Sequence, residues 1–392
     1  MRPAVEVADI FRRHGESYLQ AHGSHIGRVE RRVMAAITAC RTAALGGHVE
    51  RCADCGMLRV AYCSCRNRHC PKCQGLARAE WLDARETELL PVPHFHIVLT
   101  VPPTAAAIAF QNKAVVYDIL FQAAAETLRT VAADPKHLGA EIGILAVLHT
   151  WGQNLHHHPH IHCIVPGGGP SLDHKRWIAS RPRFFLPVRV LSRLFRRLFL
   201  KRLTDAFKAD RLRFFGELAG LTDPVAFTNY LAAPRSSDWV VYAKRPFGGP
   251  RQVLRYLGRY THRVAIANSR LIKLEDACVS FRWRDYRDSS TLKVMTLAAE
   301  EFIRRFLLHT LPDGFKRIRY YGFLANGLRV EKLALCRSLL AVEAPPSPKP
   351  IDYRERYKQL TGRSLDICPC CGGRMQSLGP LDPTDPIWCD SS

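Results

Sequence analysis

The stretch of sequence that decides the expected fold lies between residues 141 and 165 and reads EIGILAVLHTWGQNLHHHPHIHCIV. Residues 141–153 are mostly apolar and have the composition of a strand. Residues 154–159 contain asparagine, proline and a run of histidines, which predicts a turn. Residues 160–165 then predict a second strand that returns beside the first. We therefore expect an antiparallel pair at the centre of the protein.

Two histidines of the return strand are candidate metal ligands. His160 and His162 are two residues apart, so they share one face of a strand and can bind one cation. A third ligand must come from the neighbouring strand. If the turn is a hairpin, Gln153 lies opposite His160, and we prefer it as the third ligand, with His149 as the alternative. An open site of this kind suits magnesium or manganese.

The other histidines of the region are interpreted as structural. His156, His157 and His158 are expected to be exposed residues of the turn. His94 and His96 have the same spacing as the metal pair, but no histidine-rich partner strand is evident beside them. We therefore expect residues 94–101 to form an ordinary strand of the sheet.

The composition indicates a polyanionic partner. The chain of 392 residues has 57 Lys and Arg against 35 Asp and Glu, a formal net charge of +22. A basic excess of this size, spread along the chain, favours nucleic-acid binding over a merely solvated surface. The 47% of hydrophobic residues excludes bulk disorder. No signal segment or long apolar run is present, which predicts a cytoplasmic, nucleoid-associated protein without membrane contact.

Two tyrosines further along the chain are candidate nucleophiles. Tyr256 and Tyr260 are four residues apart, so they are neighbours on one face of the helix predicted over residues 250–261. A tyrosine with its ordinary pKa of about 10 is a poor nucleophile. A divalent cation bound to a scissile phosphate favours the phenolate form. The flanking arginines are suited to neutralising a DNA backbone, and they are Arg255, Arg259 and Arg263.

Other stretches interleave basic and aromatic residues, as proteins that hold single-stranded DNA do. They include residues 281–287, with Arg282 and Arg284, and residues 315–321. The alternative is that strand alternation places these aromatic rings in the core and the arginines in water. Just before the tyrosine helix, Lys244 and Arg245 precede a Gly/Pro turn and could bind a phosphate.

Fourteen cysteines in a protein expected to be cytoplasmic favour metal binding over disulfides. Two C-x2-C pairs separated by 14 residues can close a tetrahedron around a structural zinc ion, and they are Cys52, Cys55, Cys70 and Cys73. Further candidate ligands close to them are Cys63, Cys65, His69 and His48. In the tail, Cys368 and Cys371 form half of a zinc ribbon, with Cys389 downstream.

We divide the chain into four consecutive segments: a helical segment (1–47), a zinc-binding module (48–90), a catalytic domain (91–343), and a linker with a cysteine-containing tail (344–392). Within the catalytic domain, further strands are expected over residues 239–243, 264–273, 278–284 and 292–297. Helices are expected over residues 113–132, 188–218, 298–310 and 326–341. This mixture predicts an α+β fold with a central antiparallel sheet.

The cysteine pairs, residues 158–169 (HPHIHCIVPGGG) and residues 256–268 (YLGRYTHRVAIAN) resemble the transposases of the insertion sequence 91 family. The resemblance covers about residues 6–340. It implies an HUH endonuclease-like fold, in which a central antiparallel sheet flanked by helices carries the metal histidines, with a small N-terminal zinc module. It also implies two tyrosine nucleophiles and rolling-circle-like transposition.

The resemblance therefore predicts a metal-dependent enzyme that nicks and transfers single-stranded DNA through 5′-phosphotyrosine intermediates. The expected partners are single-stranded DNA at the transposon ends and at the target. No P-loop is present, so unwinding would fall to a host helicase and replication factors. Two alternatives remain: a plasmid or phage replication initiator or relaxase with the same chemistry, and a non-catalytic zinc-dependent DNA-binding protein.

Overall fold

The structure is a computed structural model that describes residues 5–244, 249, 252, 254–256, 258, 265–285, 288–346 and 351–381. The chain divides into two compact units. Unit 1 contains residues 1–81, 262–310 and 347–392, and unit 2 contains residues 82–261 and 311–346. Both units are discontinuous in sequence, whereas the four segments expected from the sequence are consecutive.

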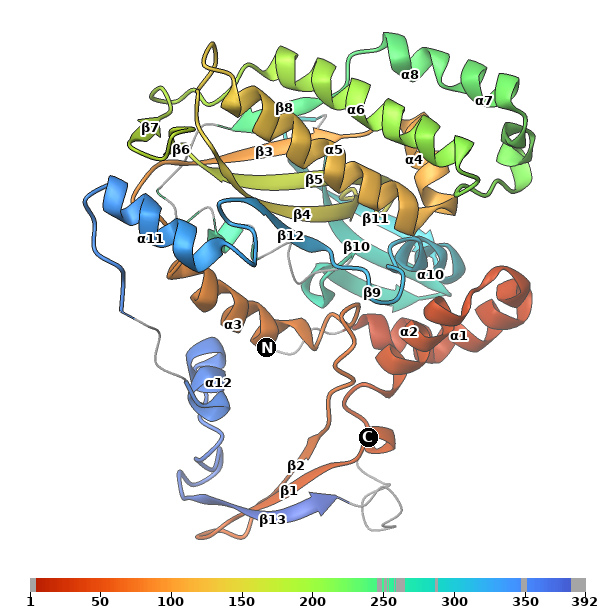
Figure 1. Ribbon diagram of the computed structural model, residues 1–392. Helices are drawn as coiled ribbons and strands as arrows, with labels where there is room; N and C mark the ends of the chain where they lie inside the picture. The colour runs from red at the N-terminus through yellow and green to blue at the C-terminus, as the bar shows by residue number, and fades with distance from the viewer. Residues whose placement is uncertain are drawn as a thin grey trace. The chain divides into compact units, whose positions relative to one another are not determined.

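The centre of unit 2 is an antiparallel sheet of five strands in the order β12-β4-β5-β3-β8. The strands are β3 (His94–Thr100), β4 (Gly143–Trp151), β5 (His157–Pro166), β8 (Val241–Lys244) and β12 (Ile318–Gly322). The hairpin expected around residues 141–165 is therefore present as β4 and β5, at the middle of the sheet (Figure 1).

Alternation along these strands separates two faces of the sheet. Ile144, Ala146 and Leu148 on β4, with Ile161 and Cys163 on β5, are buried in the main hydrophobic core. Helices α5 (Lys113–Ala133) and α6 (Val188–Lys208) lie over this face (Figure 1). The residues between them along the strands face the other way, and they include His96, His149, His160 and His162.

Three shorter helices complete the core side of unit 2, namely α4 (Pro103–Gln111), α7 (Pro224–Tyr230) and α8 (Ala232–Ser236). A two-stranded ribbon and one further helix follow elsewhere in the unit, and they are β6 (Gly168–Pro170), β7 (Trp177–Ala179) and α11 (Arg329–Leu339). The helix expected to reach residue 218 ends at Lys208, because Asp210 adopts a left-handed backbone conformation with φ of 50°. Strand β12 overlaps residues 315–321, where a strand was expected only as the alternative to a DNA-binding stretch.

Unit 1 holds two three-stranded antiparallel sheets. The first has the order β13-β1-β2 and contains β1 (Gly47–Cys52), β2 (Leu58–Tyr62) and β13 (Met375–Leu381). The second has the order β11-β10-β9 and contains β9 (Leu271–Glu275), β10 (Cys278–Asp285) and β11 (Thr291–Ala298). The α-helices wholly within this unit are α1 (Val7–His22), α2 (Arg28–Ala39), α10 (Ala299–Leu308) and α12 (Tyr353–Thr361).

The core of unit 1 joins segments that are far apart in sequence. The Phe11 ring of α1 packs edge-on against Phe306 of α10, with 5.4 Å between centroids, and Phe281 of β10 packs against Phe302. Helix α3 (Gln74–Glu86) crosses the boundary between the units in sequence, at Trp81.

The expected α+β class with a central antiparallel sheet is confirmed. Residues 245–248 and most of residues 250–264 lie outside the described part of the chain. These residues include much of the segment in which the tyrosine helix was expected. Among the residues that the structure does describe, no helix has the length and apolar character needed to cross a bilayer.

Candidate metal centre and cysteine clusters

Three histidines gather on the face of the unit 2 sheet that α5 and α6 leave uncovered. His149 on β4 is paired directly with His160 on β5, and His162 follows two residues later on the same face. One ring nitrogen from each of the three lies within 4.8 Å of the others. Three imidazoles on one rigid hairpin form a ligand set with positions left for water or substrate, as in catalytic metal sites.

Hydrogen bonds orient two of these rings so that they can bind a cation. His160 Nδ1 donates to the carbonyl of His158 at 2.6 Å, which leaves Nε2 of that ring as the ligand atom. His162 Nδ1 lies 2.7 Å from Nε2 of His96, and the two rings are stacked. Metal-binding histidines commonly use the second ring nitrogen in this way, so the residues fit a divalent cation.

Burial keeps these imidazoles neutral, which is the form that binds metal. Loss of solvation lowers the pKa of His160 to about 3 and that of His96 to about 4. The pKa of His162 lies well below its ordinary value for the same reason, with His149 adding to the effect. The rings of His160 and His162 can therefore each offer a lone pair to a cation at neutral pH.

The register expected for the hairpin was wrong. His149, not Gln153, is paired with His160, because β5 begins at His157 and the connecting turn is shorter than expected. Gln153 lies in that turn, beyond the last residue of β4. His149, the alternative, is thus the residue that belongs to the cluster with the two expected histidines. His157 is not an exposed turn residue either, since its Nε2 lies 2.8 Å from the Tyr117 hydroxyl.

One of the two expected nucleophiles lies beside this cluster. The ring of Tyr256 is 5.6 Å from the ring of His96, and the ammonium of Lys244 lies 6.0 Å from the same tyrosine ring. Arg255 is exposed to solvent. The remaining residues expected here, Tyr260, Arg259, Arg263 and Arg245, lie outside the described part of the chain.

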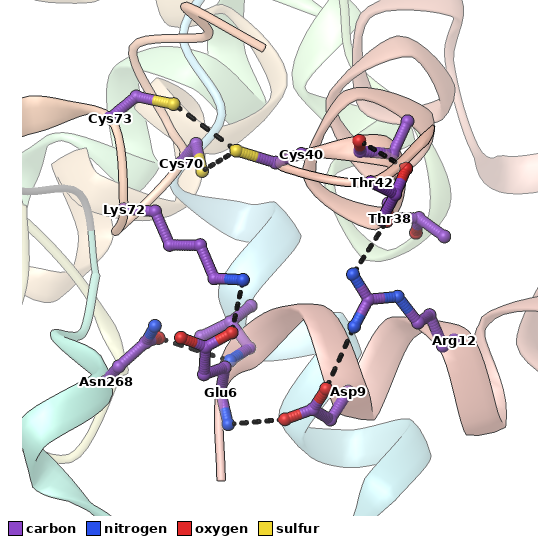
Figure 2. Close-up of polar contacts among 12 residues, drawn as sticks. Glu6, Asp9, Arg12, Thr38, Cys40, Thr42, Cys70, Lys72, Cys73 and Asn268 are labelled. Carbon is purple, nitrogen blue, oxygen red and sulfur yellow. Dashed lines mark hydrogen bonds and ion pairs between the residues drawn. The ribbon is translucent and has the colours of Figure 1, made fainter. Parts of the chain in front are cut away.

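Eight of the cysteines that the structure describes form two clusters in unit 1. In the first, the Sγ atoms of Cys40, Cys65, Cys70 and Cys73 lie within 4.8 Å of one another. Cys40 follows α2 and approaches the second cysteine pair, with 3.4 Å from its Sγ to Cys73 and 3.6 Å to Cys70 (Figure 2). A nearby ion pair between Lys72 and Glu6, both almost fully buried, ties this pair to the start of α1.

The second cluster contains Cys52, Cys55, Cys368 and Cys371. The expectation that the two N-terminal pairs share one zinc ion was therefore wrong, because the structure assigns each pair to a different cluster. Of the further candidates, Cys65, Cys368 and Cys371 join a cluster, whereas Cys63, His69 and His48 belong to neither. Cys389 lies outside the described residues.

The remaining basic candidates lie on β10 of unit 1. Arg282 and Arg284 are exposed and share one face of the strand, while Phe281 is fully buried on the other face. In the second basic and aromatic stretch, Arg319 of β12 lies over the Phe121 ring and forms an ion pair with Asp118. Strand alternation thus places Phe281 in the core, and the Arg319 side chain is engaged in packing.

Two residues of these sites were missed in the sequence. Cys40 belongs to no C-x2-C pair, so spacing gives no signal for it. His96 was interpreted as a structural residue, although it shares the H-x-H spacing of the metal pair. The signal that could have found it is the pairing of two H-x-H strands, because adjacent antiparallel strands bring such histidines together on one face.

Two family models match the chain. The model described as "Putative transposase" matches residues 143–332, and the model described as "Transposase zinc-binding domain" matches residues 10–101. The chain is 62% identical over 385 residues to "Putative transposase y4qJ" of Sinorhizobium fredii, covering 97% of this chain and 96% of the relative. It is 28% identical over 354 residues to "Transposase for insertion sequence element IS801" of Pseudomonas savastanoi pv. phaseolicola, covering 88% and 83%. No solved structure gives a significant match.

Together with the α+β fold and the cysteine clusters, these matches define a transposase, an enzyme that acts on DNA. The chain belongs to the insertion sequence 91 family of transposases. The cysteines of the first cluster all fall within the matched zinc-binding domain, and the histidine cluster falls within the other matched region.

Proposed function

We propose that this transposase nicks and joins single-stranded DNA through 5′-phosphotyrosine intermediates, with Tyr256 and Tyr260 as nucleophiles. The observation that carries the proposal is the cluster of His149, His160 and His162, whose ligand atoms lie within 4.8 Å of one another on the sheet face beside Tyr256. These positions support an HUH-type arrangement, in which a nucleophile on a helix would meet a metal site on the central sheet.

The three histidines would hold a divalent cation, which acts as a Lewis acid on the scissile phosphate when bound. An all-imidazole set favours manganese over magnesium, because magnesium prefers oxygen ligands. In this respect the site differs from the mixed nitrogen and oxygen set expected with Gln153.

The residues of the chain provide the nucleophile and its surroundings. The phenolic oxygen of Tyr256 attacks phosphorus, the bond from phosphorus to the 3′-oxygen breaks, and the DNA is left with a free 3′-hydroxyl and a 5′ end linked to the tyrosine. The ammonium of Lys244, close to the Tyr256 ring, favours the phenolate and attracts the phosphate. Tyr260 would serve the second strand transfer, and either tyrosine could act first.

The net charge of +22 supports binding along a DNA backbone. Arg255, Arg282 and Arg284 are exposed and available for such contacts, and Arg245, Arg259 and Arg263 are proposed from the sequence. The substrates are single strands from the transposon ends and the target, and a host helicase with replication factors would supply them in unpaired form. We propose that the structural zinc of the matched domain is held by Cys40, Cys65, Cys70 and Cys73, whose sulfur atoms lie within 4.8 Å of one another.

Strand polarity tests the proposal. A single-stranded oligonucleotide from an element end, labelled at either its 5′ or its 3′ end, is incubated with protein and manganese. We expect the 3′-labelled fragment to migrate with the protein on a denaturing gel and the 5′-labelled fragment to migrate as free DNA that a polymerase can extend. Two free fragments would contradict tyrosine chemistry and indicate hydrolysis.

A further inference from the structure

We propose that Cys52, Cys55, Cys368 and Cys371 bind a second zinc ion, so that the C-terminal tail is a structural part of the zinc-binding domain. The matched domain model ends at residue 101, and two of these ligands lie more than 260 residues beyond it. The proposal concerns this cluster alone and does not depend on the tyrosine chemistry.

The sulfur geometry fits a tetrahedral zinc site. Cys52 Sγ lies 3.4 Å from Cys371 Sγ, and Cys55 Sγ lies 3.7 Å from Cys368 Sγ. Zinc–sulfur bonds of about 2.3 Å in a tetrahedron place neighbouring sulfurs about 3.8 Å apart, whereas a disulfide places them about 2.05 Å apart. The four thiols are thus too far apart for disulfides and close enough for a shared cation.

The two cysteine pairs also have the same local backbone structure. Cys52 N–H donates to the Met57 carbonyl at 2.9 Å, and Cys368 N–H donates to the Gly373 carbonyl at 2.8 Å, the same separation of five residues. In both pairs the residue after the second cysteine is a glycine in the left-handed region, Gly56 with φ of 71° and Gly372 with φ of 80°.

The second of these turns also presents backbone donors to its sulfurs. The N–H of Cys370 lies 3.4 Å from Cys368 Sγ, and the N–H of Gly373 lies 3.4 Å from Cys371 Sγ. Such donors stabilise thiolates, which are the form that binds zinc. Two matching turns that face each other therefore provide the four ligands from two segments.

Contacts around the cluster hold the tail against the N-terminal segment. β13 pairs antiparallel with β1, with Met375 opposite Cys52 and Leu381 opposite Gly47. β1 is therefore the middle strand of its sheet, and without the tail it would be an edge. Arg354 of α12 also forms ion pairs with Glu50, on β1, and with Asp366.

This arrangement has a consequence for the synthesis of the protein. Because two of the ligands are Cys368 and Cys371, the second site can form only after the chain has been made as far as residue 371. A transposase copy truncated before residue 368 would keep the first cluster and lose the second.

Thiol alkylation of the wild-type full chain tests the proposal directly. Cys55, Cys370 and Cys371 are all exposed, so only a bound metal or a disulfide bond would protect their thiols from alkylation. In zinc-loaded protein we expect Cys370 to be alkylated rapidly, and Cys55 and Cys371 at least tenfold more slowly. A chelator should remove that protection. The proposal is overturned if Cys371 reacts as fast as Cys370, or if only a reductant exposes Cys55 and Cys371.

Cobalt substitution provides a second readout. Thiolate-to-cobalt absorbance per chain should fall to about half in Cys368→Ser/Cys371→Ser, because one of two four-thiolate sites is lost. The matched control Cys370→Ser changes a neighbouring cysteine outside the cluster and should leave the absorbance unchanged. An unchanged absorbance in the double variant would overturn the proposal, and the alkylation experiment remains decisive if that variant does not fold.

Discussion

The histidine cluster of unit 2 and the cysteine clusters of unit 1 differ in how they would hold a metal ion. Each cysteine cluster offers four thiolates and closes the coordination sphere, as structural zinc sites do. The histidine cluster offers three imidazoles and leaves positions open. The second cysteine cluster joins segments that lie 319 residues apart, whereas the first lies within residues 40–73 and the histidines come from one hairpin. A closed four-cysteine site can therefore join separate segments of the chain, whereas the open site that we propose for catalysis is built on a single hairpin.

The largest effect should follow from removing a ligand of the histidine cluster. His160→Ala should lower the rate of single-strand nicking about a thousandfold, since Lewis-acid stabilisation contributes several kcal/mol and about 1.4 kcal/mol corresponds to a factor of ten. Cobalt binding to thiolates and the thermal unfolding midpoint should change little. Nicking at the wild-type rate by His160→Ala would show that this cluster is not the catalytic site.

Removing ligands from the first cysteine cluster should lower the stability of the fold around it. Cys65→Ser/Cys70→Ser removes two of four ligands, and structural zinc contributes roughly 10 kcal/mol or more to the folding of small modules. We expect residues 40–73 to become sensitive to proteases, with loss of about half of the thiolate-bound cobalt.

The control for that experiment is Cys63→Ser, which changes a nearby cysteine outside both clusters. It should remain resistant to proteolysis. If the double variant were as resistant as the control, the first cluster would not be a structural metal site.

These two regions also differ in how far the sequence predicts them. The hairpin and its histidines are local in sequence, so strand periodicity alone places His160 and His162 on one face. The third ligand depends on register, and the difference between a turn beginning at residue 152 and one beginning at residue 154 moves His149 into the cluster in place of Gln153. The second cysteine cluster depends on a contact across 319 residues between Cys52 and Cys371, and the first depends on Cys40, which belongs to no C-x2-C pair. No spacing rule predicts either arrangement.

An intermediate effect is expected at His96, which we interpret as a positioning residue that orients His162. Loss of a hydrogen-bond partner of a metal ligand typically lowers metal affinity about 10- to 100-fold. His96→Ala should therefore weaken manganese binding by that amount, measured by calorimetry without DNA. His96→Gln should restore part of the affinity, because its amide oxygen can accept from His162 Nδ1.

The matched control for His96 is His94→Gln, on the same strand and face. His94 Nδ1 bonds to the Val92 carbonyl rather than to a cluster residue. Its substitution should leave manganese affinity within about twofold of wild type, given that the metal ligands keep their partners. Equal losses from both variants would mean that His96 acts only through packing of the sheet.

The smallest effect is expected at Lys244. Removing one cation near the Tyr256 ring should weaken single-stranded DNA binding a few-fold and reduce the slope of log affinity against log salt by about 0.7. Fluorescence anisotropy at several salt concentrations would measure both values for Lys244→Ala. The control is Lys175→Ala, which changes an exposed lysine in the turn between β6 and β7. An identical salt slope in both variants would show that Lys244 does not contact the DNA.

The central claim is that the histidine cluster supports covalent tyrosine chemistry, and one gel tests it. Labelled single-stranded DNA from an element end is incubated with manganese and wild-type protein, Tyr256→Phe/Tyr260→Phe or His160→Ala/His162→Ala, and then denatured. We expect a covalent protein–DNA adduct with wild type and none with either double variant. An adduct formed by either variant, or no adduct with wild type, would contradict metal-dependent tyrosine chemistry at this cluster.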